Sequence, residues 1–514
     1  MNEDSKKINN GNHEATHRRS ASQSGASEYN APEKKPVENK SAEKAATPTA
    51  EAEDQRGGTL RERLSRVKPT RWVRFGLVSV LFFAWVAWLG NWWVAPWWLL
   101  LVDIYLTQYI PWSWWRHSKS SVVRNVMSWV DAIVYALILV YFLFAFVGQN
   151  YQIPSSSLEK TLLTGDFLWV NKMVYGPRVP QTPLHFPLAQ NTMPIIGGKS
   201  YIENPQFAYH RLKGWRNVER GDIVVFNYPC GDTVALGVDN AVSYYELVRS
   251  QGRDIVQRDY DVVYRPVDRR DAYVKRCVGL PGDSLKIVNG VIICNGTAEK
   301  QPENVQFFYL VKTTKVPISD ELFDELGISA EDHAPGRMTR SGDTFTYALP
   351  LTAAMRDKLK AYPWVMSVTP IGDDPSDSFK TYPLGENYGW THTDYGPIWI
   401  PKKGATVDLS QGHNYALYER CIRTYEGNTL ERKGGKFYIN GKDTKTYTFK
   451  MDYYWMMGDN RDNSLDSRYW GFVPEDHIIG TPMVVLISFD KDKSLFKGGI
   501  RWNRVFKGAN PDKK

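Results

Sequence analysis

The stretch AYVKRCVGLPGDSLKIVNGVIICNG (272–296) decides the fold class of this chain. Its apolar runs SLKIV and VIIC flank Asn289-Gly290, a dipeptide that favours a tight hairpin turn because both residues tolerate positive φ. Other short apolar runs bounded by turn residues are GDIVVFNYP (221–229), GGKFYINGK (434–442) and PMVVLISFD (482–490). They come without βαβ alternation or an internal repeat, so we expect a mainly β, antiparallel domain after the first 150 residues.

Three apolar runs precede this β region, at about 72–94, 97–114 and 127–147, and each is near the length that spans a hydrocarbon core. The second run is the weakest because Asp103 lies inside it, and it either crosses the membrane or only dips into it. Many of the 19 tryptophans crowd this part of the chain, which is typical of membrane interfaces. We therefore expect a membrane-anchored protein.

Basic residues flanking the apolar runs set the expected orientation. Arg71 and Arg74 lie at the start of the first run, and Arg116, Lys119 and Arg124 lie between the second and third. Basic loops stay cytoplasmic, so the last crossing should deliver the β domain to the periplasmic side of the cytoplasmic (inner) membrane, in a multi-pass protein. The net charge of +8 then favours lipid over nucleic acid, because no basic face with interleaved aromatics stands out.

Composition and pattern divide the chain into five expected parts. Residues 1–70 are polar and poor in large apolar side chains, which predicts a disordered cytoplasmic tail. Residues 71–148 should form the membrane anchor with about three transmembrane helices, and the β pattern follows in 149–296, in 297–447 together with a helix or two, and in 448–514.

The cysteines and histidines offer little catalytic chemistry. The four cysteines are Cys230, Cys277, Cys294 and Cys421, and none forms a C-x-x-C pair, so metal ligation through them is not expected. They could form one or two disulfides outside the cytoplasm, or remain buried thiols. None of the nine histidines lies in a triad-like or H-E-x-x-H setting, and we interpret His392, His413 and His477 as surface or loop residues.

The stretch YQIPSSSLEKTLLTGDFLWVNK (151–172) places three serines after a proline, just beyond the last apolar run. A serine becomes a nucleophile only when a base removes its proton, and a lysine can serve if burial lowers its pKa toward neutrality. Lys275 in AYVKRCV is a candidate, since strand alternation turns its side chain away from Arg276. The alternative is that both are exposed strand charges.

A third stretch, MGDNRDNSLDSRYWGFVPEDHIIG (457–480), is dense in charged and short polar side chains, among them Asp459, Asp466 and Arg468. Such a density suits a rigid polar network that holds a site. Taken alone, the stretch could equally be an ordinary ion-paired loop.

In this order after a membrane anchor, the three stretches and RGDIVVFNYP resemble the signature boxes of type I signal peptidases (leader peptidases), the membrane-bound Ser/Lys protease family. The resemblance covers about 149–292 and 448–490. It implies a signal peptidase I/SOS-repressor protease-like β fold and a serine endopeptidase that removes N-terminal signal peptides from exported preproteins at the outer face of the membrane. The resemblance also implies that 149–296 is the first part of a catalytic core with insertions, 297–447 an inserted cap domain, and 448–514 the second part of the core and the C-terminus. Preprotein signal peptides and membrane lipid are the implied partners, the protein translocation machinery is a further candidate, and no cofactor or metal is implied.

The same resemblance implies roles for individual residues. Ser157 would be the nucleophile, Lys275 the general base and Ser464 the residue that orients the lysine. Ser155 and the backbone amide of Ser157 would form the oxyanion hole. Asp466 and Arg468 match the structural ion pair of the family, with Asp459 in the same network. A pocket for small side chains such as Ala would be lined by Ile153, Pro154, Leu158, Leu162, Tyr273 and Val274.

The chain departs from the family pattern at three positions beside the expected nucleophile. Ser156 replaces a usual Gly, Leu158 a usual Met, and Lys160 stands where many members have Pro. Two rival interpretations remain: a self-cleaving repressor, which the apolar runs disfavour, and a catalytically dead β module that binds exported chains. The presence of Ser157 and Lys275 in their motifs disfavours the second rival.

Overall fold

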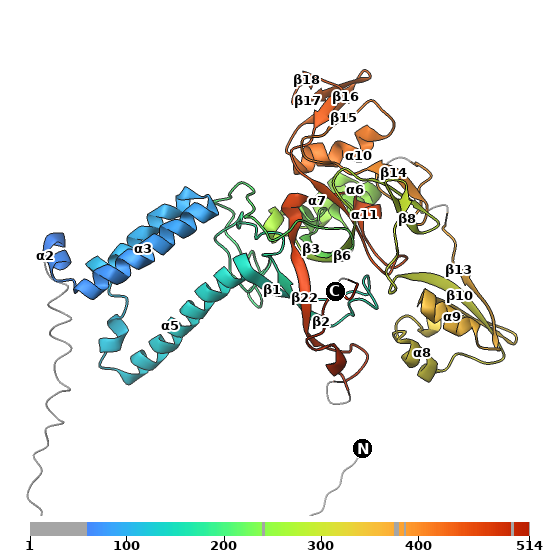
Figure 1. Ribbon diagram of the computed structural model, residues 1–514, viewed down its shortest axis with the longest axis horizontal. Coiled ribbons are helices and arrows are strands. Elements are labelled where there is room, and N and C mark those ends of the chain that lie inside the picture. The colour runs from blue at the N-terminus through green and yellow to red at the C-terminus, as the bar shows by residue number, and fades with distance from the viewer. Residues whose placement is uncertain (1–58, 239–241, 375–379, 385–386, 495–497, 513–514) are drawn as a thin grey trace, which may run out of the picture. The chain divides into compact units, whose positions relative to one another are not determined.

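The computed structural model describes residues 59–512 except 239–241, 375–379, 385–386 and 495–497 (Figure 1). Two compact units are distinguished along the chain. One contains the chain up to Leu77 together with Leu99–His117, and the other contains Val78–Trp98 and Ser118–Lys514. The β elements and the expected catalytic residues all belong to the second unit.

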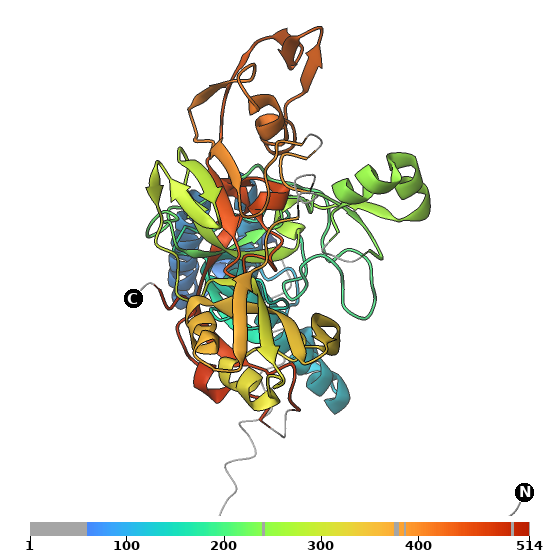
Figure 2. The same cartoon turned by 90° about the vertical axis from the view of Figure 1, so that its right-hand side faces the viewer.

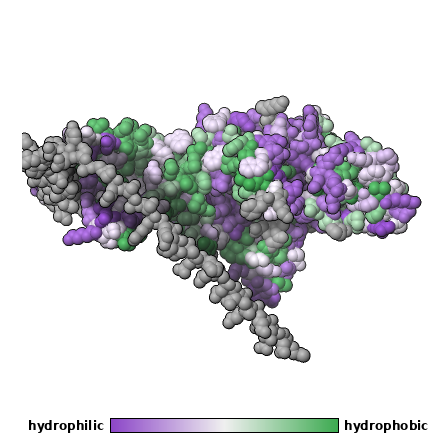
Figure 3. All heavy atoms as spheres, turned by 90° about the horizontal axis from the view of Figure 1, so that it is seen from below, coloured by the Kyte–Doolittle hydropathy of each residue, from purple (hydrophilic) through white to green (hydrophobic). Residues whose placement is uncertain are grey.

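Two helices among the described residues are long and apolar enough to cross a membrane. The first is α3 (Pro69–Leu89), and the second is α5 (Ser121–Phe142), which a π-helical turn, η4 (Leu143–Val147), extends. Apolar side chains cover their exposed surfaces, as the 68% exposure of Val80 and the 73% exposure of Trp129 illustrate, and Figure 3 shows hydrophobic residues on this helical part. Such exposed apolar helices are compatible with a lipid surrounding.

The second apolar run is shorter than expected. Its helix spans only Trp92–Thr107 and includes α4 (Trp98–Val102), whereas a span needs about 20 residues. Asp103 is buried within the run and accepts hydrogen bonds from Thr107 Oγ1 at 2.7 Å and Trp112 Nε1 at 3.0 Å. The described residues thus contain two candidate spans rather than about three.

Part of the segment expected to be disordered is helical. α2 (Leu60–Ser65) follows Thr59, whose backbone N–H donates to Glu62 Oε2 at 2.9 Å, and this contact satisfies a donor at the helix start. α3 already begins at Pro69. The rest of the expected tail, 1–58, lies outside the described residues.

A seven-stranded sheet forms the centre of the β region, and all pairings between its strands are antiparallel. Its strands, in spatial order, are β1 (Gly148–Gln152), β2 (Asp166–Asn171), β22 (Ile478–Ser488), β3 (Ile223–Asn227), β6 (Ala272–Gly279), β20 (Tyr453–Met457) and β21 (Val473–Pro474). β3 is buried along its whole length, because Val224 and Phe226 pack into one apolar cluster and Ile223 and Val225 into another. The expected strands in 221–229 and 482–490 are confirmed.

The stretch that opened the sequence analysis forms β6, β7 (Ser284–Val288) and β8 (Val291–Cys294). Asn289 and Gly290 have φ values of 48° and 76°, and Val288 pairs with Val291 across the turn. The expected hairpin is therefore confirmed. β7 and β8 continue into a sheet of order β14-β7-β8-β9, with β14 at Tyr395–Trp399 and β9 at Thr297–Ala298.

The region expected to form one cap domain has two parts. The first is a four-stranded sheet of order β11-β12-β10-β13 with two helices beside it (Figures 1 and 2). Its elements are β10 (Gln306–Thr314), α8 (Asp320–Leu326), β11 (Met338–Ser341), β12 (Thr344–Thr352), α9 (Ala353–Lys360) and β13 (Val365–Pro370). Leu322 and Phe323 of α8 and Leu359 of α9 pack with Val311 and Leu349 of the sheet in a core of its own.

The second part joins the catalytic region instead. Tyr395, Tyr418 and Phe437 share one apolar cluster with Leu285 of β7 and Trp455 of β20. The elements here are α10 (Asn414–Arg420), β15 (Thr406–Asp408), β19 (Thr446–Thr448), β16 (Leu430–Lys433), β17 (Lys436–Ile439) and β18 (Lys442–Asp443). The remaining regular elements are β4 (Thr233–Ala235), α6 (Tyr244–Gln251), α7 (Arg253–Asp259), β5 (Val262–Tyr264) and α11 (Ser467–Trp470).

The four cysteines are free and buried, so the thiol alternative is the one that the structure supports. Burial raises the pKa of the Cys294 thiol to about 11 and that of Cys421 well above its ordinary value. A thiol that stays protonated is a poor nucleophile and metal ligand.

Candidate active site

The serine segment forms a tight loop between β1 and β2, and hydrogen bonds hold both its base and its tip. Ile153 N–H donates to Asp166 O and Gly165 N–H donates to Ile153 O, both at 2.9 Å. At the tip, Asn460 N–H donates to Ser157 O at 3.1 Å, and Asn460 Nδ2 donates to Ser156 O at 3.2 Å. The backbone around Ser157 is therefore held by a segment 300 positions further along the chain.

Lys275 lies in β6, opposite Val224 of β3, and it is only 5% exposed. Its Nζ donates to Ser157 Oγ at 2.6 Å, so the expected nucleophile and the expected base are in direct contact. Burial lowers the pKa of Lys275 to about 8, although the carboxylates of Asp466 and Asp459 favour the charged amine. An amine with such a pKa is uncharged in a useful fraction of molecules near neutral pH.

Two buried ion pairs fix the surroundings of this contact. Arg468 binds Asp466 through both carboxylate oxygens, with Nε to Oδ1 at 2.9 Å and Nη2 to Oδ2 at 2.7 Å. Arg276 binds Asp459 in the same manner, at 2.8 and 2.7 Å. Paired, bidentate geometry of this kind is the condition under which buried charges are tolerated. The stretch 457–480 is thus a buried network and not a solvated loop.

Asp459 also ties this network to the serine loop, because Thr161 Oγ1 donates to Asp459 Oδ2 at 2.7 Å. Asp466 accepts from the backbone N–H of Gly458 at 3.1 Å. Thr161 and Arg276 were not among the expected site residues. The signal that could have found them is their position within the same motif stretches as Ser157 and Lys275.

Ser464 is buried, but the hydrogen bond expected between it and Lys275 is not formed in this structure. Its Oγ has no hydrogen-bond partner among the described residues. The hydroxyl lies against Gly458: a Cβ on that glycine would be 2.3 Å from Ser464 Oγ and 2.5 Å from Ser157 O. Gly458, which the sequence analysis did not single out, is therefore the residue that allows Ser464 to approach the serine loop.

The other two serines differ in their surroundings. Ser155 is exposed, and its Oγ is 3.4 Å from Ser157 Oγ. Ser156 points elsewhere, since its Oγ accepts a hydrogen bond from Asn463 Nδ2 at 3.1 Å. Of the three serines, only Ser157 has a hydroxyl that is hydrogen-bonded to Lys275.

The residues expected to line the small-side-chain pocket are brought together only in part. Ile153, Leu158, Leu162 and Val274 pack in one apolar cluster, whereas Pro154 is exposed. Tyr273 is on the opposite face of β6 from Val274. It stacks on Tyr228 at a centroid distance of 4.4 Å, and Lys275 Nζ lies 5.9 Å from the centre of its ring.

His477 is not the loop or surface residue that the sequence suggested. It is buried, with Nδ1 at 2.6 Å from Asp476 Oδ1 and Nε2 at 2.7 Å from Arg270 Nη1. Both ring nitrogens are occupied, because Arg270 can only donate and Asp476 then receives the proton on Nδ1. This histidine therefore has a structural partner on each side.

Comparison with known proteins identifies the family of this chain. A family model described as "Signal peptidase, peptidase S26" matches residues 126–317 and 443–487. A signal peptidase I of Buchnera aphidicola (subsp. Schizaphis graminum) is 25% identical over 371 residues, which cover 71% of this chain and 77% of the relative. The signal peptidase I of Haemophilus influenzae is 25% identical over 391 residues, covering 76% of this chain and 77% of the relative.

A third relative is closer in identity. The signal peptidase I of Aquifex aeolicus is 61% identical over 363 residues, covering 68% of this chain and 80% of the relative. The matched segments include the serine loop, β6 and most of the buried ion-pair network. The chain therefore belongs to the signal peptidase I family, peptidase S26, and is a serine peptidase of the hydrolase class.

Proposed function

We propose that this protein is a membrane-bound endopeptidase that cleaves N-terminal signal peptides from exported preproteins through a Ser157/Lys275 dyad. The single observation that carries the dyad is the 2.6 Å contact between Ser157 Oγ and the buried Lys275 Nζ. The family membership supports the choice of substrate.

In the proposed reaction, neutral Lys275 accepts the proton of Ser157 Oγ as that oxygen attacks the carbonyl carbon of the scissile bond. The ammonium then gives this proton to the leaving amine of the mature chain. In the second half, Lys275 takes a proton from a water molecule that attacks the acyl-enzyme ester, and it returns that proton to Ser157 Oγ as the ester C–O bond breaks and the new carboxylate leaves. The depressed pKa of Lys275 makes both directions of transfer accessible near neutral pH.

The negative oxygen of the tetrahedral intermediate needs donors that are in place before the reaction. We assign this role to the backbone N–H of Ser157 and to the hydroxyl of Ser155, which lies 3.4 Å from Ser157 Oγ. The exposure of Ser155 fits a donor that meets a substrate arriving from solvent.

Ser464 remains our candidate for the residue that orients the lysine. Its buried, unpartnered hydroxyl on the Gly458 side of the serine loop is the support for this role, since a buried hydroxyl without a partner costs stability and a catalytic role explains why it is kept. We infer that Ser464 accepts a hydrogen bond from Lys275 when the lysine releases Ser157 to the substrate.

Small residues would be selected before the cleavage site by the cluster of branched side chains on the serine loop and β6. Ile153, Leu158 and Val274 share this cluster, and in the chain Leu158 directly follows Ser157 while Val274 directly precedes Lys275. Walls of such branched side chains exclude bulk by overlap. We propose the same lining for Pro154, Leu162 and Tyr273, which requires the loop and Tyr273 to adjust as substrate enters.

We further propose that α3 and α5 cross the cytoplasmic membrane and that the β region faces the periplasm. The apolar exposure of both helices and the basic residues between them, Arg116 and Lys119, support this orientation. Membrane lipid and the translocation machinery would then be neighbours of the site. The unit formed by β10–β13 with α8 and α9 would be a cap domain inserted into the catalytic core.

The proposal is tested with purified full-length protein in detergent and a preprotein substrate. We expect a new N-terminus directly after a small residue, and no cleavage by the Ser157→Ala variant. Cleavage at scattered positions, or equal rates when Phe replaces the small residue, would contradict the specificity. A reporter fused after Gly148 tests the orientation, and a cytoplasmic signal there would contradict it.

A further inference from the structure

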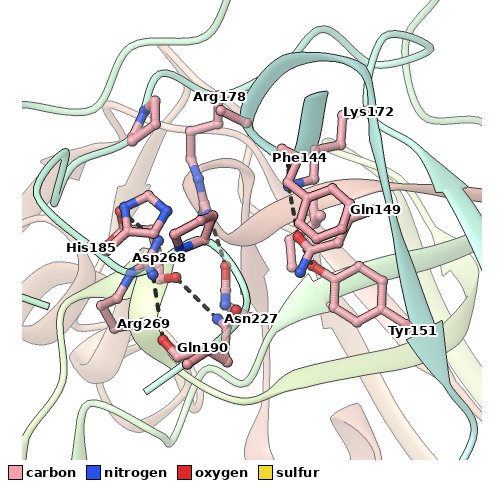
Figure 4. Close-up of a pocket in the computed structure, with 15 residues that line it drawn as sticks. Phe144, Gln149, Tyr151, Lys172, Arg178, His185, Gln190, Asn227, Asp268 and Arg269 are labelled. Carbon is pink, nitrogen blue, oxygen red and sulfur yellow. Dashed lines mark hydrogen bonds and ion pairs between the residues drawn. The ribbon is translucent and has the colours of Figure 1, made fainter. Parts of the chain in front are cut away.

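A polar pocket lies at the junction between α5 and the β region, apart from the serine loop (Figure 4). It has a volume of about 60 Å³, several times the roughly 10–15 Å³ that one water molecule requires. Phe144 of η4 and Gln149 of β1 form one side of it, and Asp268 and Arg269 lie on the other. The pocket therefore adjoins the end of a candidate membrane span.

Positive charge dominates this pocket. Lys172, Arg178 and Arg269 contribute three cations, and Asp268 is the one carboxylate among the lining residues. Asp268 is engaged through one oxygen, because its Oδ2 accepts from both the N–H and the Oγ1 of Thr182 at 2.9 Å and lies 3.6 Å from Arg269 Nη2, whereas its Oδ1 has no hydrogen-bond partner among the described residues. The two arginines therefore leave one positive charge beyond that of Asp268 in the pocket lining, and Lys172 adds a second when it is protonated.

Arg269 is buried and Lys172 is half-buried, and both are incompletely paired. Arg269 is 7% exposed, and its Nε has no hydrogen-bond partner among the described residues. Lys172 Nζ donates to Phe144 O at 2.5 Å and Gln149 Oε1 at 3.2 Å, which leaves one of its three N–H groups. Burial and then repulsion from Arg178 and Arg269 lower the pKa of Lys172 to about 7. Like charges held together out of water in this way are stabilised by an anion.

We propose that this pocket binds a phosphate group, with Arg269 and Lys172 as its principal donors. Phosphate accepts several charge-assisted hydrogen bonds at once and suits both guanidinium and ammonium partners. The small volume admits the phosphate but not acyl chains. Inorganic phosphate and a phospholipid headgroup share this chemistry; the lipid source rests on the proposed function, since it requires α5 to cross the membrane.

The position of Lys172 also has a purely structural explanation. Its amine contacts a carbonyl near the C-terminal end of the helix that α5 and η4 form, and a cation is stabilised at such an end. That explanation accounts for Lys172 but not for Arg269. Nor does it account for the neighbouring His185, whose pKa burial, with repulsion from Arg269, lowers to about 4. His185 is therefore neutral near pH 7 and adds no positive charge to the pocket.

The test measures binding and does not depend on peptidase activity. Delipidated full-length protein in a neutral detergent is titrated with short-chain phosphatidylglycerol, with inorganic phosphate, and with diacylglycerol of the same chain length. Binding is counted by native mass spectrometry. We expect one phosphate-bearing ligand per chain and none of the diacylglycerol. Arg269→Gln should weaken binding about tenfold or more, as expected for the loss of a hydrogen bond to a charged group.

Three further variants keep the test decisive if Arg269→Gln disturbs folding. Asp268→Asn should bind more tightly, because it removes the negative charge but keeps an oxygen for Thr182, and misfolding cannot cause a gain. Lys312→Gln, the same loss of charge on an exposed strand position, should bind as the wild type does. Ser157→Ala should also bind normally, which separates this inference from the proposed peptidase reaction.

Comparison of phosphatidylglycerol with inorganic phosphate identifies where the bound phosphate group comes from. Retention of phosphatidylglycerol with the expected order of variants supports a lipid headgroup site. Binding of inorganic phosphate alone, with the same order, supports a site for free phosphate. The proposal is overturned if neither ligand binds, or if Asp268→Asn and Arg269→Gln bind as well as the wild type.

Discussion

The pH dependence of cleavage should report the titration of Lys275. With a folded-state pKa of about 8, about 9% of the molecules carry a neutral Lys275 at pH 7 and about 91% at pH 9. If neutral Lys275 is the base, kcat/KM should rise roughly tenfold over this interval, because kcat/KM follows the ionisation of the free enzyme. The rate falls as the pH falls, since protonation removes the base.

The matching perturbation is Lys275→Arg, which keeps the positive charge but cannot release a proton in this range. We expect loss of turnover at every pH from 6 to 10. Lys286→Arg is the control, because it makes the same change on an exposed position of β7. It should leave both the rate and the pH profile unchanged.

The assay is the initial rate of cleavage of one preprotein by full-length enzyme in detergent, measured at low substrate concentration. A rate that is flat between pH 7 and 9 would refute the lysine base. So would near wild-type cleavage by Lys275→Arg, or disappearance of the acid limb in His392→Gln or His477→Gln.

Three further changes test the surroundings of the dyad. Gly458→Ala should reduce kcat/KM strongly in the same assay, because its Cβ would lie 2.5 Å from Ser157 O and displace the serine loop; wild-type activity would show that the loop can move freely. Ser155→Ala should leave a slow enzyme, since loss of one oxyanion donor costs roughly 10²- to 10³-fold in kcat; an unchanged kcat would remove Ser155 from the oxyanion hole. Asp466→Asn should lower the free energy of unfolding by about 3–5 kcal/mol in denaturant titrations, because it leaves Arg468 buried without its partner; a shift under 1 kcal/mol would mean that the pair is structurally dispensable.

Much of the β architecture could be predicted from sequence because its signals are local. The Asn289-Gly290 turn requires two positive φ values, which these residues adopt more readily than others, and the structure has them there. The runs in 221–229, 434–442 and 482–490 correspond to β3, β17 and β22. The helices expected within 297–447 are present, among them α8 and α9.

The meeting of Ser157 with Lys275 could not be predicted from local signals, because 118 positions separate them in sequence. The resemblance to a family supplied that pairing. It did not supply the contact between Gly458 and Ser464, because a glycine within a polar stretch shows no sign of what its missing Cβ makes room for. The division of 297–447 into two parts could not be predicted from the sequence either, since only the packing in the structure reveals that Tyr395 and Tyr418 share a core with Trp455.

The replacement of a usual proline by Lys160 has a physical explanation in this chain. Lys160 has a φ of 71°, which proline cannot adopt because its ring fixes φ near −65°. Its Nζ donates to Leu326 O at 3.0 Å and to Gly327 O, carbonyls at the C-terminal end of α8. A cation at that end of a helix is favourable, and this gain offsets the strain of a positive φ, which is about 1–2 kcal/mol. The serine loop is therefore held from outside by the C-terminal end of α8, which supplies the partners that Lys160 needs.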